Sequence, residues 1–178
     1  MNIYILRHGQ TNYNLEGKFQ GQIDTILNEN GIKQANETKE KLRHINFDIV
    51  ICSPLKRAIQ TAKIVTNKDI ITDNRIIERS FGKLEGEYSI PDYEEKLEIY
   101  QIETFEELCK RVYKFLEDTI KKYKNQNNIL IVTHECIAQV IETYFNDEKN
   151  KENWKEYRLE TGSYKKYEYR RIRKNRFK

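Results

Sequence analysis

Three short apolar runs mark the chain as one that builds buried strands. They are residues 3–6, 49–52 and 129–132, and each contains several β-branched side chains. Continuous apolar runs of this length are typical of strands covered on both faces, as in a parallel sheet. The pattern therefore predicts three buried strands.

The stretches between these runs show helical periodicity. Over residues 104–120 apolar side chains recur at the three- and four-residue spacing of an amphipathic helix, and Thr104 and Glu107 form a capping-box pattern at its start. Residues 29–44 and 136–145 are two further amphipathic candidates. Strands alternating with helices predict an α/β fold, a three-layer sandwich with a mostly parallel central sheet flanked by helices.

A further helix is expected directly after the second strand. Ser53 offers an N-cap and Pro54 suits the first helical position, which predicts that the helix begins there. Later in the chain, residues 87–103 are acidic and are interpreted as a surface excursion with a short helix. Residues 157–160 and 164–169 are interpreted as two late strands.

The domain organisation is expected to be simple. The 178 residues suit one domain, the chain contains two prolines, and no low-complexity linker interrupts it. We therefore expect a single domain over residues 1–170, followed by a basic C-terminal tail at 171–178.

The distribution of charge argues against nucleic-acid binding as the main role. The net charge is +4, but residues 165–178 hold eight Lys or Arg against Glu168, so the rest of the chain carries −3. A nucleic-acid-binding protein needs a basic face on its folded body. The charged end is interpreted as solvated, with a contact to an acidic partner as the alternative.

The cysteines and the N-terminus indicate a cytoplasmic protein. Cys52, Cys109 and Cys136 cannot all pair within the chain and show no C-x-x-C spacing, which disfavours a disulfide framework or a zinc site. The first ten residues have no basic leader, and no stretch approaches the ~20 apolar residues of a membrane span. We expect no membrane association.

Cationic side chains follow each predicted strand at its carboxyl end. Arg7 and His8 follow the first strand, Arg57 lies in the helix after the second, and His134 follows the third. In open α/β sheets, ligands bind at the carboxyl ends of the strands, so these four side chains are expected to converge. Such a set, with helix N-termini, predicts an anion site, and phosphate is the commonest anion to occupy one.

An ordered set of motifs carries a family resemblance. The chain resembles the histidine phosphatase superfamily, also called the phosphoglycerate-mutase-like family, and its phosphatase branch in particular. The matching stretches follow one another in order, at residues 7–11 (RHGQT), 19–21 (FQG), 53–58 (SPLKRA), 78–86 (ERSFGKLEG) and 132–134 (VTH).

The resemblance implies a covalent mechanism without metal or cofactor. His8 would be the nucleophile and form a phosphohistidine. Arg7, Arg57 and His134 would neutralise charge on the phosphoryl oxygens. Glu78 would protonate the leaving alkoxide and then deprotonate water, for which its pKa must rise towards neutrality.

The same resemblance implies binding residues and a partner. Four residues match positions that contact phosphate or substrate in relatives: Thr11, Asn14, Gln20 and Gly21. The expected partner is a small phosphorylated molecule. Its identity and the oligomeric state stay open.

Alternatives remain for several of these residues. His8 and His134 could be structural histidines, and Glu85 is a rival to Glu78 as the proton donor.

Cys52 to Arg57 has C-x4-R spacing, one residue short of the loop of cysteine-based phosphatases, so a cysteine nucleophile is rejected. The chain after His134 resembles the start of a zincin helix but has Ala where the second histidine ligand would stand.

Glu135 departs from the family pattern, because relatives commonly have glycine there. A carboxylate facing the phosphate pocket would repel the substrate, whereas one pointing outward would interact favourably with the helix dipole. We expect the outward orientation, because a side chain in the first helical turn reaches solvent easily.

The choice between mutase and phosphatase depends on the segment before the long helix. Glycolytic mutases of the family have a long insertion there, with basic residues that grip a substrate carboxylate. Here residues 87–103 contain one basic residue, Lys96, so water is expected to outcompete re-phosphorylation of the product. The resemblance thus favours a phosphatase. A mutase and a non-catalytic phospholigand-binding domain are the alternatives.

Overall fold

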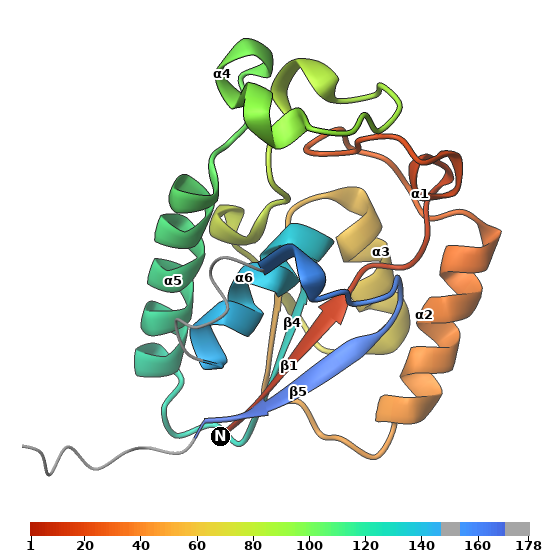
Figure 1. The fold of residues 1–178 in the computed structure, drawn as a ribbon. Helices are drawn as coiled ribbons and strands as arrows, with labels where there is room; N and C mark the ends of the chain where they lie inside the picture. The colour runs from red at the N-terminus through yellow and green to blue at the C-terminus, as the bar shows by residue number, and fades with distance from the viewer. Residues whose placement is uncertain (147–153, 170–178) are drawn as a thin grey trace, which may run out of the picture.

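A five-stranded sheet forms the centre of the protein (Figure 1). This computed structural model describes residues 1–146 and 154–169. The strand order is β3-β2-β4-β1-β5, in which the first four strands run parallel and β5 runs antiparallel to β1. The strands are β1 (Asn2–Arg7), β2 (Ile49–Cys52), β3 (Ile70–Thr72), β4 (Asn128–Thr133) and β5 (Tyr164–Glu168).

The three strands predicted from apolar runs are confirmed as β1, β2 and β4. Of the two late strands, the second is confirmed as β5, but residues 157–160 do not form a strand. The sequence analysis missed β3, because its three residues at the sheet edge are too few for a pattern. The expected basic tail at 171–178 lies outside the described residues.

The α-helices lie on both faces of the sheet and above its carboxyl edge (Figure 1). They are α1 (Asn12–Glu16), α2 (Glu29–Leu42), α3 (Lys56–Val65), α4 (Leu97–Tyr100), α5 (Phe105–Lys122) and α6 (Glu135–Phe145). The described residues also form four 3₁₀ helices, Asn74–Ile76, Gly82–Leu84, Tyr93–Lys96 and Trp154–Glu156. The capping box of α5 forms as predicted, because the Glu107 backbone amide donates to Thr104 Oγ1 at 3.2 Å and the Thr104 amide donates to Glu107 Oε2 at 2.9 Å.

The start of α3 differs from the prediction. Leu55 is the N-cap, in an extended conformation and without a side-chain cap bond, and the helix begins at Lys56. Ser53 does not cap the helix, because its buried hydroxyl bonds instead to His134 Nε2 at 2.7 Å. A tertiary contact therefore replaces the local one that the sequence suggested.

Alternate residues of the central strands pack into two separate cores. Ile5 and Ile131 face the layer that contains α5 and α6, whereas Leu6 and Val132 face the layer that contains α2 and α3. Side chains of a strand alternate between the faces of the sheet, and both faces here are covered. The predicted three-layer α/β sandwich is confirmed.

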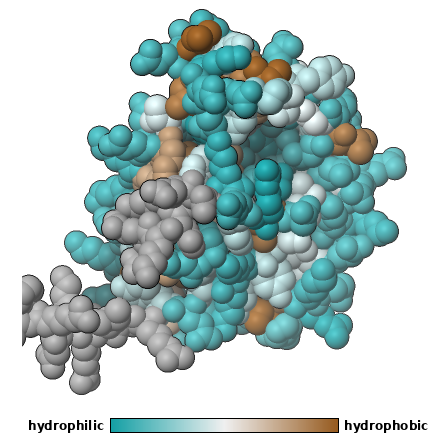
Figure 2. Space-filling model, viewed as in Figure 1, coloured by the Kyte–Doolittle hydropathy of each residue, from teal (hydrophilic) through white to brown (hydrophobic). Residues whose placement is uncertain are grey.

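The acidic excursion lies across the carboxyl edge of the sheet. Residues 93–96 form a 3₁₀ turn that continues into α4, as the expected short helix, and both lie at the top of Figure 1 with α1 nearby. Hydrophilic side chains cover most of the face seen in Figure 2. Among the described residues, no helix is both long and apolar enough to span a bilayer.

Candidate active site

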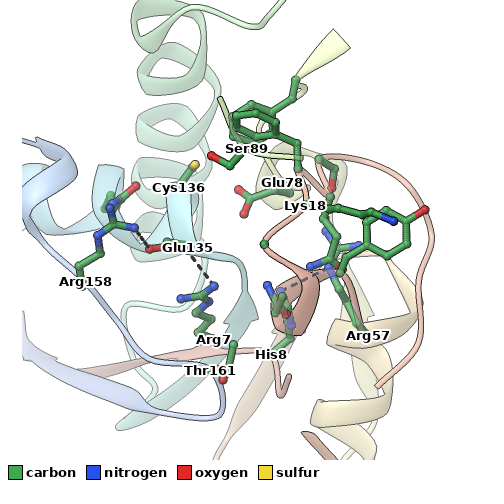
Figure 3. A pocket seen from close by; sticks show the side chains of 18 of the residues that line it. Arg7, His8, Lys18, Arg57, Glu78, Ser89, Glu135, Cys136, Arg158 and Thr161 are labelled. Carbon is green, nitrogen blue, oxygen red and sulfur yellow. Dashed lines mark hydrogen bonds and ion pairs between the residues drawn. The ribbon is translucent and has the colours of Figure 1, made fainter. Parts of the chain in front are cut away.

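A cavity of about 490 Å³ opens at the carboxyl edge of the sheet. Arg7, His8 and Arg57 line its inner end, and Glu78 lies across from them (Figure 3). His134 is next to His8, with the two ring centroids 5.1 Å apart, although it is not among the residues that line the cavity. The structure therefore brings together the five side chains for which the sequence predicted a catalytic role.

His8 is held with one ring nitrogen free to act as a base or nucleophile. Its Nδ1 lies 2.7 Å from the carbonyl oxygen of Gly9, which can accept a hydrogen bond but not donate one, so Nδ1 carries the proton. Nε2 then has a lone pair, into which Arg57 Nε donates at 3.3 Å. Burial, and then the charges of Arg57 and Arg7, hold the pKa of His8 well below its usual range. The imidazole is therefore neutral at physiological pH.

Arg57 is completely buried and fixed by backbone carbonyls. Its Nη1 donates to the Ile23 oxygen at 2.8 Å and its Nη2 to the Gly21 oxygen at 2.7 Å. Burial lowers the pKa of Arg57 to about 10, which leaves the group a cation at neutral pH. Gly21 has φ +49°, and a Cβ there would meet Glu85 Oε1 at 2.1 Å, so this turn requires glycine.

Two buried polar atoms at the inner end have no hydrogen-bond partner among the described residues. One is Arg7 Nε, although the same guanidinium donates from Nη1 to the Leu159 oxygen at 2.8 Å. The other is His134 Nδ1, whose ring is anchored through Nε2 to Ser53. Buried polar groups in proteins are nearly always paired, so both atoms are candidates for contact with a bound group, Arg7 Nε as a donor and His134 Nδ1 in a role that depends on its tautomer.

Glu78 is buried in the wall of the cavity. One of its oxygens accepts from the Arg79 backbone amide at 2.9 Å. Burial raises the pKa of Glu78, and nearby Glu135 adds to the rise, while the Arg79 amide, Arg57 and Arg7 oppose it. A carboxyl with a raised pKa can hold a proton closer to neutral pH.

Glu85, the rival proton donor, has a structural contact instead. Its Oε1 accepts from the Phe81 amide at 3.0 Å and from the Gln22 amide at 3.1 Å, which ties two loops together. It is not among the residues that line the cavity, whereas Glu78 is. The geometry therefore favours Glu78.

The four predicted binding residues divide into two groups. Asn14, Gln20 and Gly21 line the cavity. Thr11 is completely buried and caps α1, where its hydroxyl and amide both donate to the side-chain oxygen of Asn14 at 3.0 and 3.1 Å. Thr11 therefore orients Asn14, and a direct contact of Thr11 with a ligand stays a prediction.

Glu135 faces the cavity, so the expected outward orientation is wrong. Its Oε2 lies 2.9 Å from Arg7 Nη2 and its Oε1 lies 2.7 Å from Arg158 Nη1 (Figure 3). Two guanidiniums on the cavity side attract the carboxylate more strongly than solvent does, because Arg7 is almost completely buried. The sequence could not show this, since Arg158 lies 23 residues away in the chain.

The sequence analysis also missed the cations at the mouth of the cavity. Lys18, Lys155 and Arg158 line it, and each forms an ion pair: Lys18 with Glu16 at 2.7 Å, and Lys155 with Glu94 at 3.0 Å. None of them belongs to a motif in the sequence. Their position results from loops that meet only in the folded chain.

The cysteines do not supply a nucleophile. Cys52 is completely buried in β2, and burial raises the pKa of its thiol, so the rejection of a cysteine-based mechanism is consistent with the structure. Burial likewise raises the pKa of Cys136, which lines the cavity. The described residues contain no group of three or more His, Cys, Asp or Glu side chains placed to hold a metal ion.

A neutral buried imidazole beside two arginines, facing a buried carboxyl, is an arrangement suited to phosphoryl transfer. Comparison with known proteins agrees, and this chain belongs to the histidine phosphatase superfamily (branch 1), whose family model matches residues 3–176. The resemblance seen in the sequence is thus confirmed, and the chain is an enzyme of this superfamily.

Both phosphatases and mutases are among the relatives. The uncharacterized phosphatase PhoE of Bacillus subtilis (strain 168) is 37% identical over 141 residues, which cover 74% of this chain and 70% of that protein. A 2,3-bisphosphoglycerate-dependent phosphoglycerate mutase of Cytophaga hutchinsonii is 32% identical over 152 residues, 74% of this chain and 71% of that protein. A crystal structure of a phosphoserine phosphatase mutant from Entamoeba histolytica with phosphoserine superposes with a TM-score of 0.83 at 27% identity, covering 96% of this chain and 91% of that one.

Proposed function

We propose that this protein is a metal-independent phosphatase that hydrolyses a small phosphomonoester through a phosphohistidine on His8. The observation that carries the proposal is the combination of an unprotonated His8 Nε2 with two buried atoms, Arg7 Nε and His134 Nδ1, that have no hydrogen-bond partner in the part of the chain that the structure describes. A phosphoryl group at this point accepts from both donors while its phosphorus faces the nucleophile.

In the first step, the His8 Nε2 lone pair attacks phosphorus and the bond from phosphorus to the ester oxygen breaks. Burial raises the pKa of Glu78, and in its protonated form Glu78 gives its proton to the leaving oxygen, so that the alcohol departs. Arg57 Nε donates to a phosphoryl oxygen in place of the long 3.3 Å contact with the imidazole. The products of this step are the alcohol and the phosphohistidine.

In the second step, the Glu78 carboxylate takes a proton from a water molecule whose oxygen attacks phosphorus. The bond between nitrogen and phosphorus breaks, and neutral His8 and inorganic phosphate are released. With the Ser53 hydroxyl donating to Nε2 of His134, the proton of that ring sits on Nδ1, where it stabilises the phosphoryl oxygens in both steps.

A panel of phosphomonoesters tests the proposal, with sugar phosphates, phosphoglycerates, phosphoserine, nucleotides and cofactor-precursor phosphates as members. We expect release of inorganic phosphate from at least one of them, at a rate that EDTA leaves unchanged and vanadate inhibits. A strict requirement for Mg²⁺ would contradict the proposal.

A phosphoglycerate mutase is the second candidate. The similarity to the mutase of Cytophaga hutchinsonii favours it, as do Lys155 and Arg158, because cations reach the cavity from outside the cation-poor segment 87–103. Both cations are paired with carboxylates, which weakens their hold on a free product. Efficient conversion of 3-phosphoglycerate to its 2-isomer, without release of phosphate, would replace the phosphatase proposal with this one.

A further inference from the structure

Arg158 lies at the mouth of the cavity and is anchored at one end. It belongs to the segment between the 3₁₀ turn at Trp154–Glu156 and β5. Its side chain is 68% exposed, and Nη1 donates to Glu135 Oε1 at 2.7 Å. A guanidinium carries several N–H donors, of which the bond to Glu135 uses one, so the same group can also donate to a ligand.

Glu135 links this arginine to the inner end of the cavity. Each of its oxygens accepts from a different guanidinium, Arg7 at 2.9 Å and Arg158 at 2.7 Å, and its side chain is 22% exposed. Because both oxygens are already paired, the carboxylate is a poor site for a cationic group of a substrate. The side chains of Arg7, Glu135 and Arg158 together carry one net positive charge.

The geometry sets Arg158 apart from the phosphate position. Figure 3 shows Arg158 on the far side of Glu135 from His8 and Arg57, with its guanidinium turned towards the cavity. An ester whose phosphorus faces His8 Nε2 directs its leaving group away from that nitrogen and towards Glu78 and the mouth. Glu135 therefore separates Arg158 from the phosphoryl position, and Arg158 is placed to meet a part of the substrate other than the transferred group.

The other cations of the mouth are less suited to such a role. Lys155 is bound to Glu94 at 3.0 Å, and Lys18 is bound to Glu16 at 2.7 Å. Each is a single ammonium; Glu16 compensates the charge of Lys18, whereas Lys155 shares Glu94 with buried Arg79. A guanidinium held through one nitrogen still presents a fork of donors that matches the oxygens of a carboxylate or phosphate.

We infer that Arg158, held in place by Glu135, is a specificity-determining residue that binds a second anionic group on the leaving-group part of the substrate. This inference rests on the proposed function. It defines the substrate class as phosphomonoesters with a carboxylate or a second phosphate on the alcohol portion. Glu135, in this view, is a positioning residue.

Matched ligand pairs test the inference. 3-Phosphoglycerate and glycerol 3-phosphate share a carbon skeleton and differ in one carboxylate, while fructose 1,6-bisphosphate and fructose 6-phosphate differ in one phosphate. Binding of all four is measured by calorimetry in a His8→Ala background, so that the result does not depend on turnover. We expect Arg158→Gln to weaken binding of the ligand with the second anionic group, in the preferred pair, by about 10- to 100-fold, and binding of its partner by less than about twofold.

The two ligand pairs identify which anion Arg158 binds. A selective loss of affinity for 3-phosphoglycerate indicates a carboxylate, and a selective loss of affinity for fructose 1,6-bisphosphate indicates a phosphate. Arg43→Gln is the matched control, since it removes the same charge from an exposed site paired with Glu40 and outside the cavity. Equal weakening of both members of each pair, or no weakening in either pair, would overturn the inference. Phosphate release by the wild type is measured separately, so failure of the proposed function is distinguishable.

The Glu135→Gln substitution distinguishes two roles of Glu135, which are positioning Arg158 and competing with the substrate phosphate for Arg7. If Glu135 positions Arg158, this substitution lowers the ratio of affinities for 3-phosphoglycerate and glycerol 3-phosphate about as Arg158→Gln does. If Glu135 only competes with phosphate for Arg7, both affinities rise together and the ratio does not change, which contradicts the positioning role.

Discussion

The inner end and the mouth of the cavity are built in different ways. At the inner end, Arg7, His8, Arg57 and His134 are buried, follow strands of the sheet and are fixed by backbone carbonyls or by Ser53. At the mouth, Lys18 and Arg158 come from loops and Lys155 from a 3₁₀ turn, and all three are partly exposed and pair with carboxylates. Buried charges interact strongly and exposed pairs weakly. The inner end is therefore suited to chemistry and the mouth to selection among substrates.

Removal of the nucleophile should have the largest effect. His8→Ala is expected to reduce kcat by at least about 10³-fold, because no other side chain at the inner end can take up the phosphoryl group. The measurement is phosphate release under saturating substrate, with far-UV circular dichroism to confirm folding.

Rapid quenching of the wild type in alkaline detergent during turnover is the companion experiment. The protein should carry base-stable, acid-labile phosphate on His8, and the variant should carry none. Label on Cys52 or Ser53 would show that the nucleophile has been assigned to the wrong residue.

Removal of the proton donor should have a smaller effect that depends on the leaving group. Glu78→Gln is expected to slow hydrolysis of alkyl phosphates by about 10²- to 10⁴-fold. It should affect p-nitrophenyl phosphate far less, because that leaving group departs without protonation. Kinetics on both substrates check this, and Glu85→Gln is the control for the rival donor. Equal losses on both substrates would contradict the role of Glu78.

The smallest expected effect concerns stability against pH. Burial lowers the pKa of His8 and of His134 below the ordinary value of 6.5, so the folded protein keeps them neutral where the unfolded chain takes up protons. The free energy of unfolding therefore decreases as the pH falls from 6.5 towards the lowered values, by up to about 1.4 kcal/mol per pH unit for each histidine.

Thermal melts between about pH 7.5 and 5.5 measure this dependence. His8→Ala should show a shallower decrease in Tm with falling pH than the wild type, because one of the two buried imidazoles is gone. Arg158→Gln should follow the wild-type slope, because the mouth contains no such group. If Tm decreases with falling pH as steeply in His8→Ala as in the wild type, the inner end of the cavity does not differ from the mouth in this respect.

Much of the inner end follows from local sequence. Apolar runs of four residues produce buried parallel strands, and parallel strands bring their carboxyl ends to one edge, so the residues after them converge whatever the loops do. Glu78 was recognised through a motif. Its preference over Glu85 needed the structure, which shows the Glu85 carboxylate occupied by backbone amides.

The arrangement of charges at the mouth of the cavity could not be predicted from the sequence. The orientation of Glu135 depends on Arg158, and the role of Ser53 depends on His134, 81 residues away. Periodicity reports which face of an element is buried, because burial repeats along the element. An ion pair or a side-chain hydrogen bond between distant segments leaves no such repeat. The sequence by itself thus determined the layers, the strand ends and the residues that converge at the inner end of the cavity, whereas the tertiary structure alone decided which charges neutralise one another at the mouth.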